Sequence, residues 1–175
     1  ALLRQLFFTC LEYPARIMAL NKLAGQTQAA GALETVSHYL QVLEQAFLVA
    51  AIQKFSLRAL KRRSSPPKLV VLNNALLAAL RDCEPGSQEW GSRVENACLA
   101  HAINSGQQVL YWRDEPYEVD GIFSGSWGKW AVEVKTGNFV MRDLAGLLEF
   151  SRRHPDYQPL VLCSRQRAAE GLDGI

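Results

Sequence analysis

The chain has 175 residues, of which 49% are hydrophobic, so it can bury one large core or two small ones. A formal net charge of +2 does not by itself indicate a nucleic-acid-binding protein, and any basic surface must be local. The four cysteines are scattered without metal-binding spacing, which argues against a disulfide framework or structural zinc. No apolar run approaches about twenty residues, so we expect no membrane span and a cytoplasmic location.

The first part of the chain has a helical pattern. Residues 1–25 are helix-like with an interruption at Pro14, and residues 25–31 predict a polar turn. Because the chain opens directly on an apolar, helical run, we expect it to be part of a longer protein. Residues 32–46 predict a strongly amphipathic helix. Its apolar stripe consists of Val36, Tyr39, Leu40, Leu43 and Phe47.

Two β-prone runs follow, at residues 47–55 and 68–72, and a basic loop joins them. Helix, turn, helix and a two-stranded return with a basic tip form the outline of a winged helix. The basic side chains could hold DNA phosphates, and the alternative is a solvated hairpin tip. The candidate nucleic-acid-binding residues are Lys61, Arg62 and Arg63, with Arg58 and Lys68 in the same basic group. The preceding amphipathic helix carries few cations, so we expect backbone contact with DNA, or none, in preference to base readout.

A linker is predicted at residues 81–89, where Pro, Gly, Ser and charged residues occur together after a short apolar helix at residues 73–80. We therefore predict two domains, a winged-helix-like domain at residues 1–80 and a second domain at residues 81–175. The second domain begins with a helix and continues with three strands, a helix and a last strand. These elements are expected at residues 91–104, 108–112, 118–122, 130–135, 141–153 and 159–163.

Three charged residues on neighbouring strands stand out in the second domain: Asp120, Glu133 and Lys135. Side chains alternate between the faces of a strand, so pairing of the two strands as a hairpin would bring two carboxylates and an ammonium together. Oxygen ligands of this kind suit a hard cation such as Mg²⁺, which could polarise a phosphoryl oxygen and activate a water. The alternative is an exposed sheet edge at which the glutamate and lysine neutralise one another.

An acidic residue near a strand end, followed by Glu-x-Lys on the next strand, resembles the signature of the PD-(D/E)XK nucleases. The order of helix, three strands, helix and strand also matches that superfamily. The resemblance implies an α+β fold, with a restriction-endonuclease-like α/β core and a mixed central sheet. It also implies that Asp120 and Glu133 hold Mg²⁺ or Mn²⁺ and that Lys135 orients the attacking water. Glu95 lies where the family's first helix often supplies another acid, and the alternative places it on the solvated side of that helix.

Nearly the whole chain resembles the C-terminal region of a large prokaryotic family whose members begin with an AAA+ ATPase domain. The matching segments include TVSHYLQVLEQAFLV, SSPPKLVVL, VLYWRDEPYEVD and AVEVK. The resemblance implies an ATPase domain upstream, so ATP would bind outside this chain and that domain would be a partner. One departure is Gly121, where the family usually has an aromatic residue. A glycine there is expected to loosen the strand beside Asp120.

The function expected from these features is a Mg²⁺-dependent phosphodiesterase module that acts on DNA within a larger ATPase protein. Asp120, Glu133, Lys135 and Glu95 are the candidate catalytic residues. The alternative is a non-catalytic module that binds DNA or protein and regulates or docks the attached ATPase.

Overall fold

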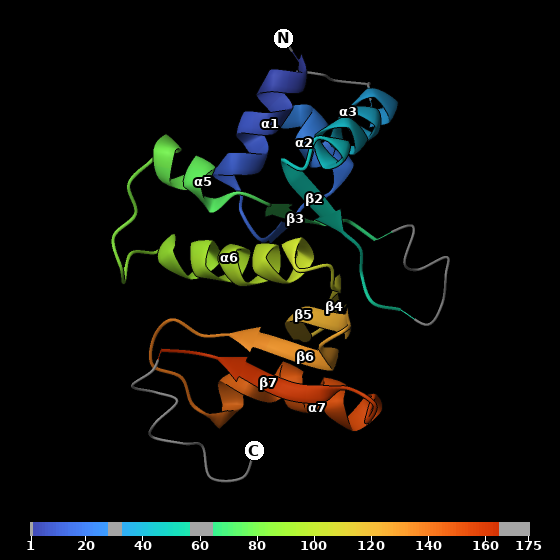
Figure 1. Ribbon diagram of the computed structural model, residues 1–175, viewed down its shortest axis with the longest axis vertical. Coiled ribbons are helices and arrows are strands. Elements are labelled where there is room, and N and C mark those ends of the chain that lie inside the picture. The colour runs from blue at the N-terminus through green and yellow to red at the C-terminus, as the bar shows by residue number, and fades with distance from the viewer. Residues whose placement is uncertain (1, 28–32, 57–64, 165–175) are drawn as a thin grey trace.

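A computed structural model describes residues 2–27, 33–56 and 65–164. Within them the fold is α+β, as the sequence predicted, and its elements stack as layers along the long axis (Figure 1). N-terminal helices lie over a three-stranded sheet, and one long helix separates that sheet from a four-stranded sheet. A last helix covers the far face of the second sheet. No helix in the described ranges is long and apolar enough to cross a bilayer.

The N-terminal layers contain helices followed by two paired strands, as predicted, and one short strand that the prediction does not include. Strand β3 is central, and the sheet order β1-β3-β2 is antiparallel throughout. Strand β1 departs from the helical prediction for residues 1–25, because Pro14 ends the helical pattern and Ala15, with φ 57°, turns the chain into a short strand. The elements are α1 (Leu2–Glu12), β1 (Arg16–Ile17), α2 (Leu20–Gln26), α3 (Leu33–Gln45), β2 (Val49–Ile52) and β3 (Lys68–Val71).

Two local predictions in this half were wrong. Gly25 lies inside α2, so the helix continues past the start of the predicted turn. Phe47 does not extend the apolar stripe of α3, because the helix ends at Gln45 and Phe47 adopts a φ of 54°. Its side chain is 77% exposed. Val36, Leu40 and Leu43 are buried as predicted.

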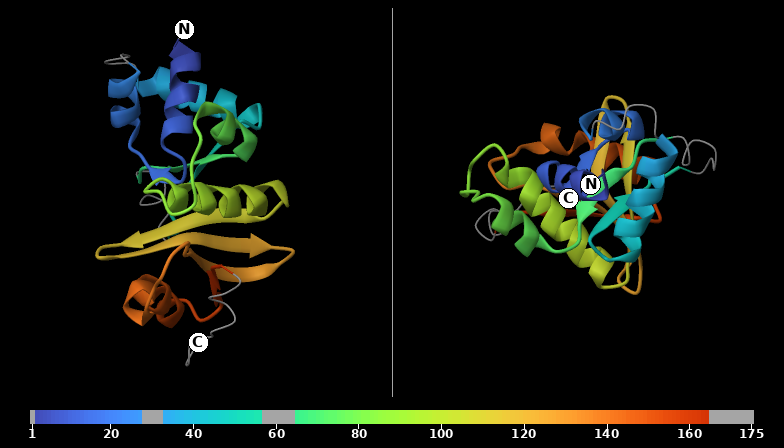
Figure 2. Two further views of the ribbon diagram at one scale, coloured as in Figure 1. Left: turned by 90° about the vertical axis from the view of Figure 1, so that its left-hand side faces the viewer. Right: turned by 90° about the horizontal axis from the view of Figure 1, so that it is seen from above.

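The connection between the halves begins with α5 (Asn74–Leu80), whose first turn is capped by Asn73 accepting from the Ala75 amide at 3.0 Å. Residues 81–89 form turns closed by an exposed Arg81–Glu89 ion pair. Helix α6 (Trp90–Asn104) follows and lies between the two sheets (Figure 2). A separation into two folding units at residues 81–89 stays a prediction.

The second sheet has the order β4-β5-β6-β7, with two antiparallel pairs and a parallel β6–β7 pair. It is therefore mixed, as expected. A parallel pair needs a crossover, which η1 (Met141–Leu144) and α7 (Ala145–Arg153) supply. The strands are β4 (Gln108–Asp114), β5 (Tyr117–Gly125), β6 (Gly128–Val134) and β7 (Gln158–Leu162).

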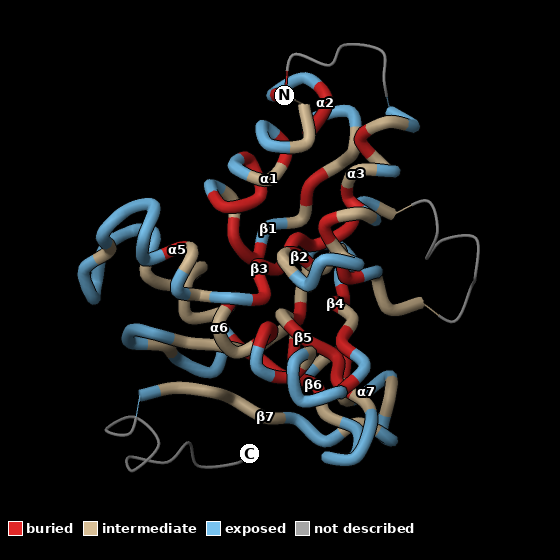
Figure 3. The backbone as a smooth tube through the Cα atoms, turned by 45° about the horizontal axis from the view of Figure 1, so that its top comes forward, coloured by how far each residue is buried: buried red, intermediate tan, exposed pale blue. Residues whose placement is uncertain are grey.

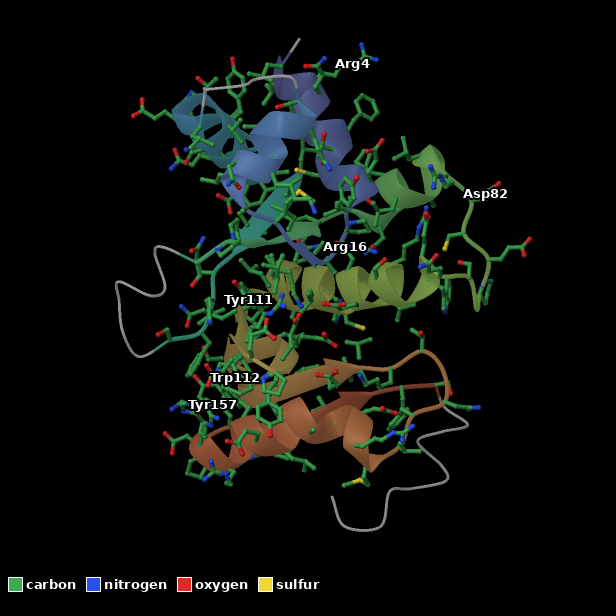
Figure 4. All side chains as sticks on the ribbon, turned by 180° about the vertical axis from the view of Figure 1, so that it is seen from behind. Arg4, Arg16, Asp82, Tyr111, Trp112 and Tyr157 are labelled. Atoms are coloured by element: carbon green, nitrogen blue, oxygen red, sulfur yellow. The ribbon has the colours of Figure 1, made fainter. Side chains whose placement is uncertain are left out.

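Alternating residues of β4 show how the sheet is covered on both faces. Tyr111 packs toward α6, whereas Trp112 packs toward α7, where its ring meets Phe150 at 5.3 Å (Figure 4). Buried residues gather in β3, β4, β5 and β6 and on the helix faces that contact these strands, whereas β7 is intermediate to exposed (Figure 3).

The three-stranded sheet and the long helix share a core and a buried polar contact. Val70 from β3 and Leu99 from α6 belong to one hydrophobic cluster with Phe123 of β5. Fully buried Asn96 of α6 accepts from the Val71 amide at 2.8 Å and donates to the Val71 carbonyl at 2.9 Å. The end of β3 is thereby fixed in position relative to α6.

Candidate functional site

The site begins with a break in the pairing of β5. Leu110 pairs with Ile122 and Trp112 pairs with Val119, so Asp120 and Gly121 together oppose a single residue of β4. Such a β-bulge re-aims a side chain and interrupts the ladder. On the other side, the last β5–β6 pair is Gly121 with Val132. Beyond it, Asp120 Oδ2 accepts from the Val134 amide at 2.8 Å, so a carboxylate takes the place of a main-chain partner.

Glu133 and Lys135 lie on β6 and just after it, beside this break. Continuing the register from Gly121–Val132 places Glu133 opposite Asp120. Glu133 Oε1 accepts from Lys135 Nζ at 2.7 Å, and the two side chains are 10% and 25% exposed. The other oxygen, Glu133 Oε2, is buried and has no hydrogen-bond partner in the described part of the chain. The structure thus brings the three strand residues together and leaves one buried acceptor without a donor.

Glu95 reaches the same place from α6 and does not lie on a solvated face. Its side chain is 18% exposed and accepts from Lys68 Nζ at 2.7 Å. Lys68 also contacts Asp120, with 3.3 Å from Nζ to the carbonyl oxygen and 3.8 Å to Oδ1. The alternative of a solvated Glu95 is therefore wrong.

Lys68 belongs to the site and not, as the sequence predicts, to the basic loop. Its side chain is 1% exposed and points from β3 into the acid cluster. The signal available in the sequence was its position at the head of the apolar run KLVVL, which is typical of a buried strand. A lysine in such a strand needs buried acidic partners. Lys61, Arg62 and Arg63 lie outside the described residues.

Burial and mutual repulsion raise the pKa values of two acids in the cluster. The pKa of Glu95 is raised to about 8, chiefly by burial and further by the charge of Asp120, against the opposing effect of Lys68. The pKa of Glu133 is raised to about 7 by burial and by Asp120, while Lys135 and the Asp120 backbone oppose the shift. The cluster therefore retains protons near neutral pH, and a cation that displaced them would remove repulsion among the acids.

The donor set fits a hard cation with few protein ligands. No group of three or more His, Cys, Asp or Glu side chains within residues 2–27, 33–56 and 65–164 is placed to hold a metal. Mg²⁺ is commonly bound by only one or two carboxylates, and waters and substrate phosphates complete its coordination. Asp120 and Glu133 supply two carboxylates, and Glu133 Oε2 has a free acceptor position. The residues thus fit a two-carboxylate Mg²⁺ or Mn²⁺ site.

Gly121 leaves room for neighbouring side chains at the position where the pairing of β5 breaks. A Cβ at this position would lie 2.4 Å from Phe123 Cε1 and 2.9 Å from Leu99 Cδ2. The Phe123 ring lies against the glycine backbone and fills that space. The bulge that carries Asp120 is consequently packed tightly against α6.

A cavity of about 260 Å³ adjoins the site at Lys135. It lies between α6 and the ends of β6 and β7, and its lining includes Trp90, Val94, Cys98, Lys135, Thr136 and Cys163. A larger cavity of about 490 Å³ lies at Arg16, Arg81 and Arg93 and includes none of the clustered acids. The smaller cavity reaches a candidate functional group, Lys135.

Comparison with known families divides the chain into two matches. Residues 1–87 match the model described as Domain of unknown function (DUF8612). Residues 90–174 match Domain of unknown function (DUF4143), a domain typically found in AAA-type ATPase proteins. No curated protein and no solved structure matches the chain. The second match is consistent with the expected relationship to ATPase proteins, and neither match names a nuclease or a winged helix.

Proposed function

We propose that this chain is a Mg²⁺- or Mn²⁺-dependent phosphodiesterase module that acts on DNA within a larger AAA+ ATPase protein. The observation that supports this most is the meeting of Asp120 and Glu133 at the end of the β5–β6 ladder, with buried Glu133 Oε2 lacking a partner. Lys135 extends from the same point to an adjoining cavity.

Each residue has a role that follows from its contacts. The Val134 amide fixes the Asp120 carboxylate, and the Glu133 side chain is anchored through Oε1 while Oε2 stays available. Lys135 is partly exposed and can donate a hydrogen bond to an attacking water without leaving the site. The bound cation would polarise a non-bridging phosphate oxygen and lower the pKa of a water. Glu95 lies on α6, close enough to Asp120 for the two charges to interact, and so influences the charge of the Asp120–Glu133 pair.

DNA association would depend on positive charge outside the acid cluster. We propose Lys61, Arg62 and Arg63 as phosphate-contacting residues, on the strength of their position between β2 and β3 in the chain. Phosphate contacts of this kind position the backbone and carry no sequence information.

The test is cleavage of single- and double-stranded DNA with Mg²⁺ or Mn²⁺, together with direct titration of cation binding. Asp120→Asn keeps an acceptor for the Val134 amide but removes the charge, so it should abolish both cation binding and cleavage. Lys135→Ala should retain cation binding and lose cleavage by at least about 100-fold, the usual contribution of a positioned proton-transfer or electrostatic group. Asp156→Asn is the matched control, because Asp156 is exposed and pairs with Lys129. Cleavage that persists in Asp120→Asn would contradict the proposal.

The second candidate is a non-catalytic module that docks or regulates the attached ATPase. It is favoured by the two lysine–glutamate contacts, which already pair acids of the cluster without a metal. In that case the wild-type chain would bind neither Mg²⁺ nor Mn²⁺, and Asp120→Asn would change only stability.

A further inference from the structure

Trp90, the first residue of α6, is an aromatic side chain that packs in none of the hydrophobic clusters of the described residues. The other three tryptophans have partners. Trp112 and Trp130 pack in or against core clusters, and the Trp127 ring lies 5.8 Å from the ring of His101. Trp90 is only half-buried, so a large apolar ring is left in contact with solvent at the start of the helix.

Trp90 lies between two cavities. Together with Val94 it lines both the cavity of about 260 Å³ that reaches Lys135 and a second cavity of about 360 Å³. The second cavity is closed by α5 and the turns that follow it, which lie beside the first turns of α6 (Figure 1). Both volumes are near the lower end of the range of about 300–1,000 Å³ for small-molecule sites, so each cavity has room for one small group. Because they share two walls, the cavities form one hollow along the first turns of α6, here called the α6 hollow.

The α6 hollow has mostly apolar walls in its middle and cations at its two ends. Lys135 lines only the cavity at one end. Arg81 and Arg93 line the other cavity, and both also line the cavity of about 490 Å³ farther from the acid cluster. Asp82, which follows α5, is the acid among the lining residues of the hollow (Figure 4). Arg81 pairs with Glu89 at the surface, where its side chain is 68% exposed and can exchange that partner for another anion.

We propose that the α6 hollow binds a single strand of DNA, with a base stacked on Trp90 and the adjoining phosphodiester directed toward Lys135. Grooves that bind single strands combine cations for the phosphates with aromatic rings for the bases. The position of the phosphodiester rests on the proposed function, whereas the base contact rests on the unpacked ring and the two cavities. In a duplex the bases are paired and stacked, so their faces reach an aromatic side chain only after unpairing. The substrate class is therefore single-stranded DNA or an unpaired DNA end.

The test is fluorescence anisotropy of a labelled oligothymidylate of about 12 nucleotides, with the whole chain in metal-free buffer so that binding is measured without cleavage. Wild type should bind it at least about 5-fold more tightly than a blunt duplex of the same length, and Trp90→Ala should remove that difference. Trp127→Ala is the matched control, because Trp127 is 43% exposed and lines neither cavity, and it should bind as wild type. Equal wild-type affinity for the two DNA forms, or unchanged binding by Trp90→Ala, would overturn the inference.

Trp90→Phe covers the case in which Trp90→Ala does not fold, because it keeps an aromatic ring at the same place. This variant should retain the preference for the single strand. A stacked base also quenches tryptophan fluorescence, so oligothymidylate should quench the fluorescence of wild type, and Trp90→Phe should lose that quenching. Equal quenching of the two chains would assign the stacking to another tryptophan and overturn the inference.

The arginine end of the α6 hollow is tested by salt dependence. Arg81→Gln should lower the slope of log affinity against log salt concentration by about 0.7, the value for one phosphate contact on a single strand. An unchanged slope would show that the strand does not extend to this end of the hollow.

The outcomes separate this inference from the proposed function. Binding of the single strand that depends on Trp90, without cleavage in Mg²⁺ or Mn²⁺, would keep the α6 hollow as a DNA-binding site and contradict the phosphodiesterase. Equal cleavage of single- and double-stranded DNA by both wild type and Trp90→Ala would keep the phosphodiesterase and overturn the role of the hollow. An oligouridylate bound more tightly than the oligothymidylate would overturn the assignment to DNA.

Discussion

Asp120 lies between two lysine–glutamate pairs that have the same contact distance and different surroundings. Lys68 and Glu95 meet at 2.7 Å where β3 and α6 pack together, and Lys135 and Glu133 meet at 2.7 Å on β6 and just beyond it. The first lysine is almost fully buried, whereas the second is a quarter exposed and adjoins a cavity. The same pair of residue types thus serves as a fixed counter-charge in one place and as a group accessible to a ligand in the other.

The largest expected effect is a difference in the free energy of unfolding between variants of the two lysines. Lys68→Met should lower the free energy of unfolding by about 3 to 5 kcal/mol, because it leaves buried carboxylates without their partner. Lys135→Met should cost about 1 to 2 kcal/mol, since water reaches that side chain and can solvate Glu133 in part. Urea unfolding of both variants in metal-free buffer measures the difference. Equal losses would show that the two pairs do not differ as their burial indicates.

The next largest effect tests the contact between Asn96 of α6 and Val71 of β3, which holds the strand that carries Lys68. Asn96→Ala removes contacts to the Val71 amide and carbonyl and to Asn74 Oδ1, all from a fully buried side chain. We expect a loss of about 3 kcal/mol, because two main-chain groups of β3 are left without partners. Asn104→Ala is the matched control on the same helix. It removes one partly buried contact to the Leu72 carbonyl and should cost about 1 kcal/mol. Thermal or urea unfolding measures both losses. If Asn96→Ala lowered the free energy of unfolding no more than the control, the Asn96–Val71 contact would not be important for stability.

The smallest effect is a pH dependence that distinguishes Glu95 from an ordinary surface acid. Its pKa is raised from 4.5 to about 8 by burial, so between these values the folded chain holds a proton that the unfolded chain has released. This contribution to stability is complete below pH 4.5 and is lost as the pH rises toward 8. We expect metal-free wild type to lose about 2 kcal/mol between pH 5.5 and 7.5, within the limit for one proton. Glu95→Gln should reduce the slope to the part contributed by Glu133, whose pKa is also raised, to about 7. An unchanged slope in that variant would assign the pH dependence to other groups.

Several features of the site could be read from the chain before any fold was known. The Asp and Glu-x-Lys residues occur on adjacent β-prone runs joined by a glycine-containing turn, and strand alternation places their side chains close together. The helices at residues 33–45 and 90–104 and the strands around them agree with the periodicity of their apolar residues. Periodicity works here because each element buries one face, and that requirement is written into local sequence.

Other features depend on contacts between segments far apart in the chain. Lys68 lies 27 residues before Glu95 and 52 before Asp120, and only the packing of β3 on α6 joins them. The bulge at Asp120 and Gly121 is likewise invisible in a count of alternating residues, because it depends on how β4 and β6 pair with β5 on either side. Phe123 filling the space over Gly121 follows from that bulge.

The sequence by itself determined the residue types of the site and the elements that carry them, because strand and helix periodicity are local. The tertiary structure decided which charges face one another and how strongly water screens them, because burial is a property of the assembled layers. Lys68 shows the difference most clearly: in the sequence it follows a basic loop, and in the fold it is the buried counter-charge of three acids.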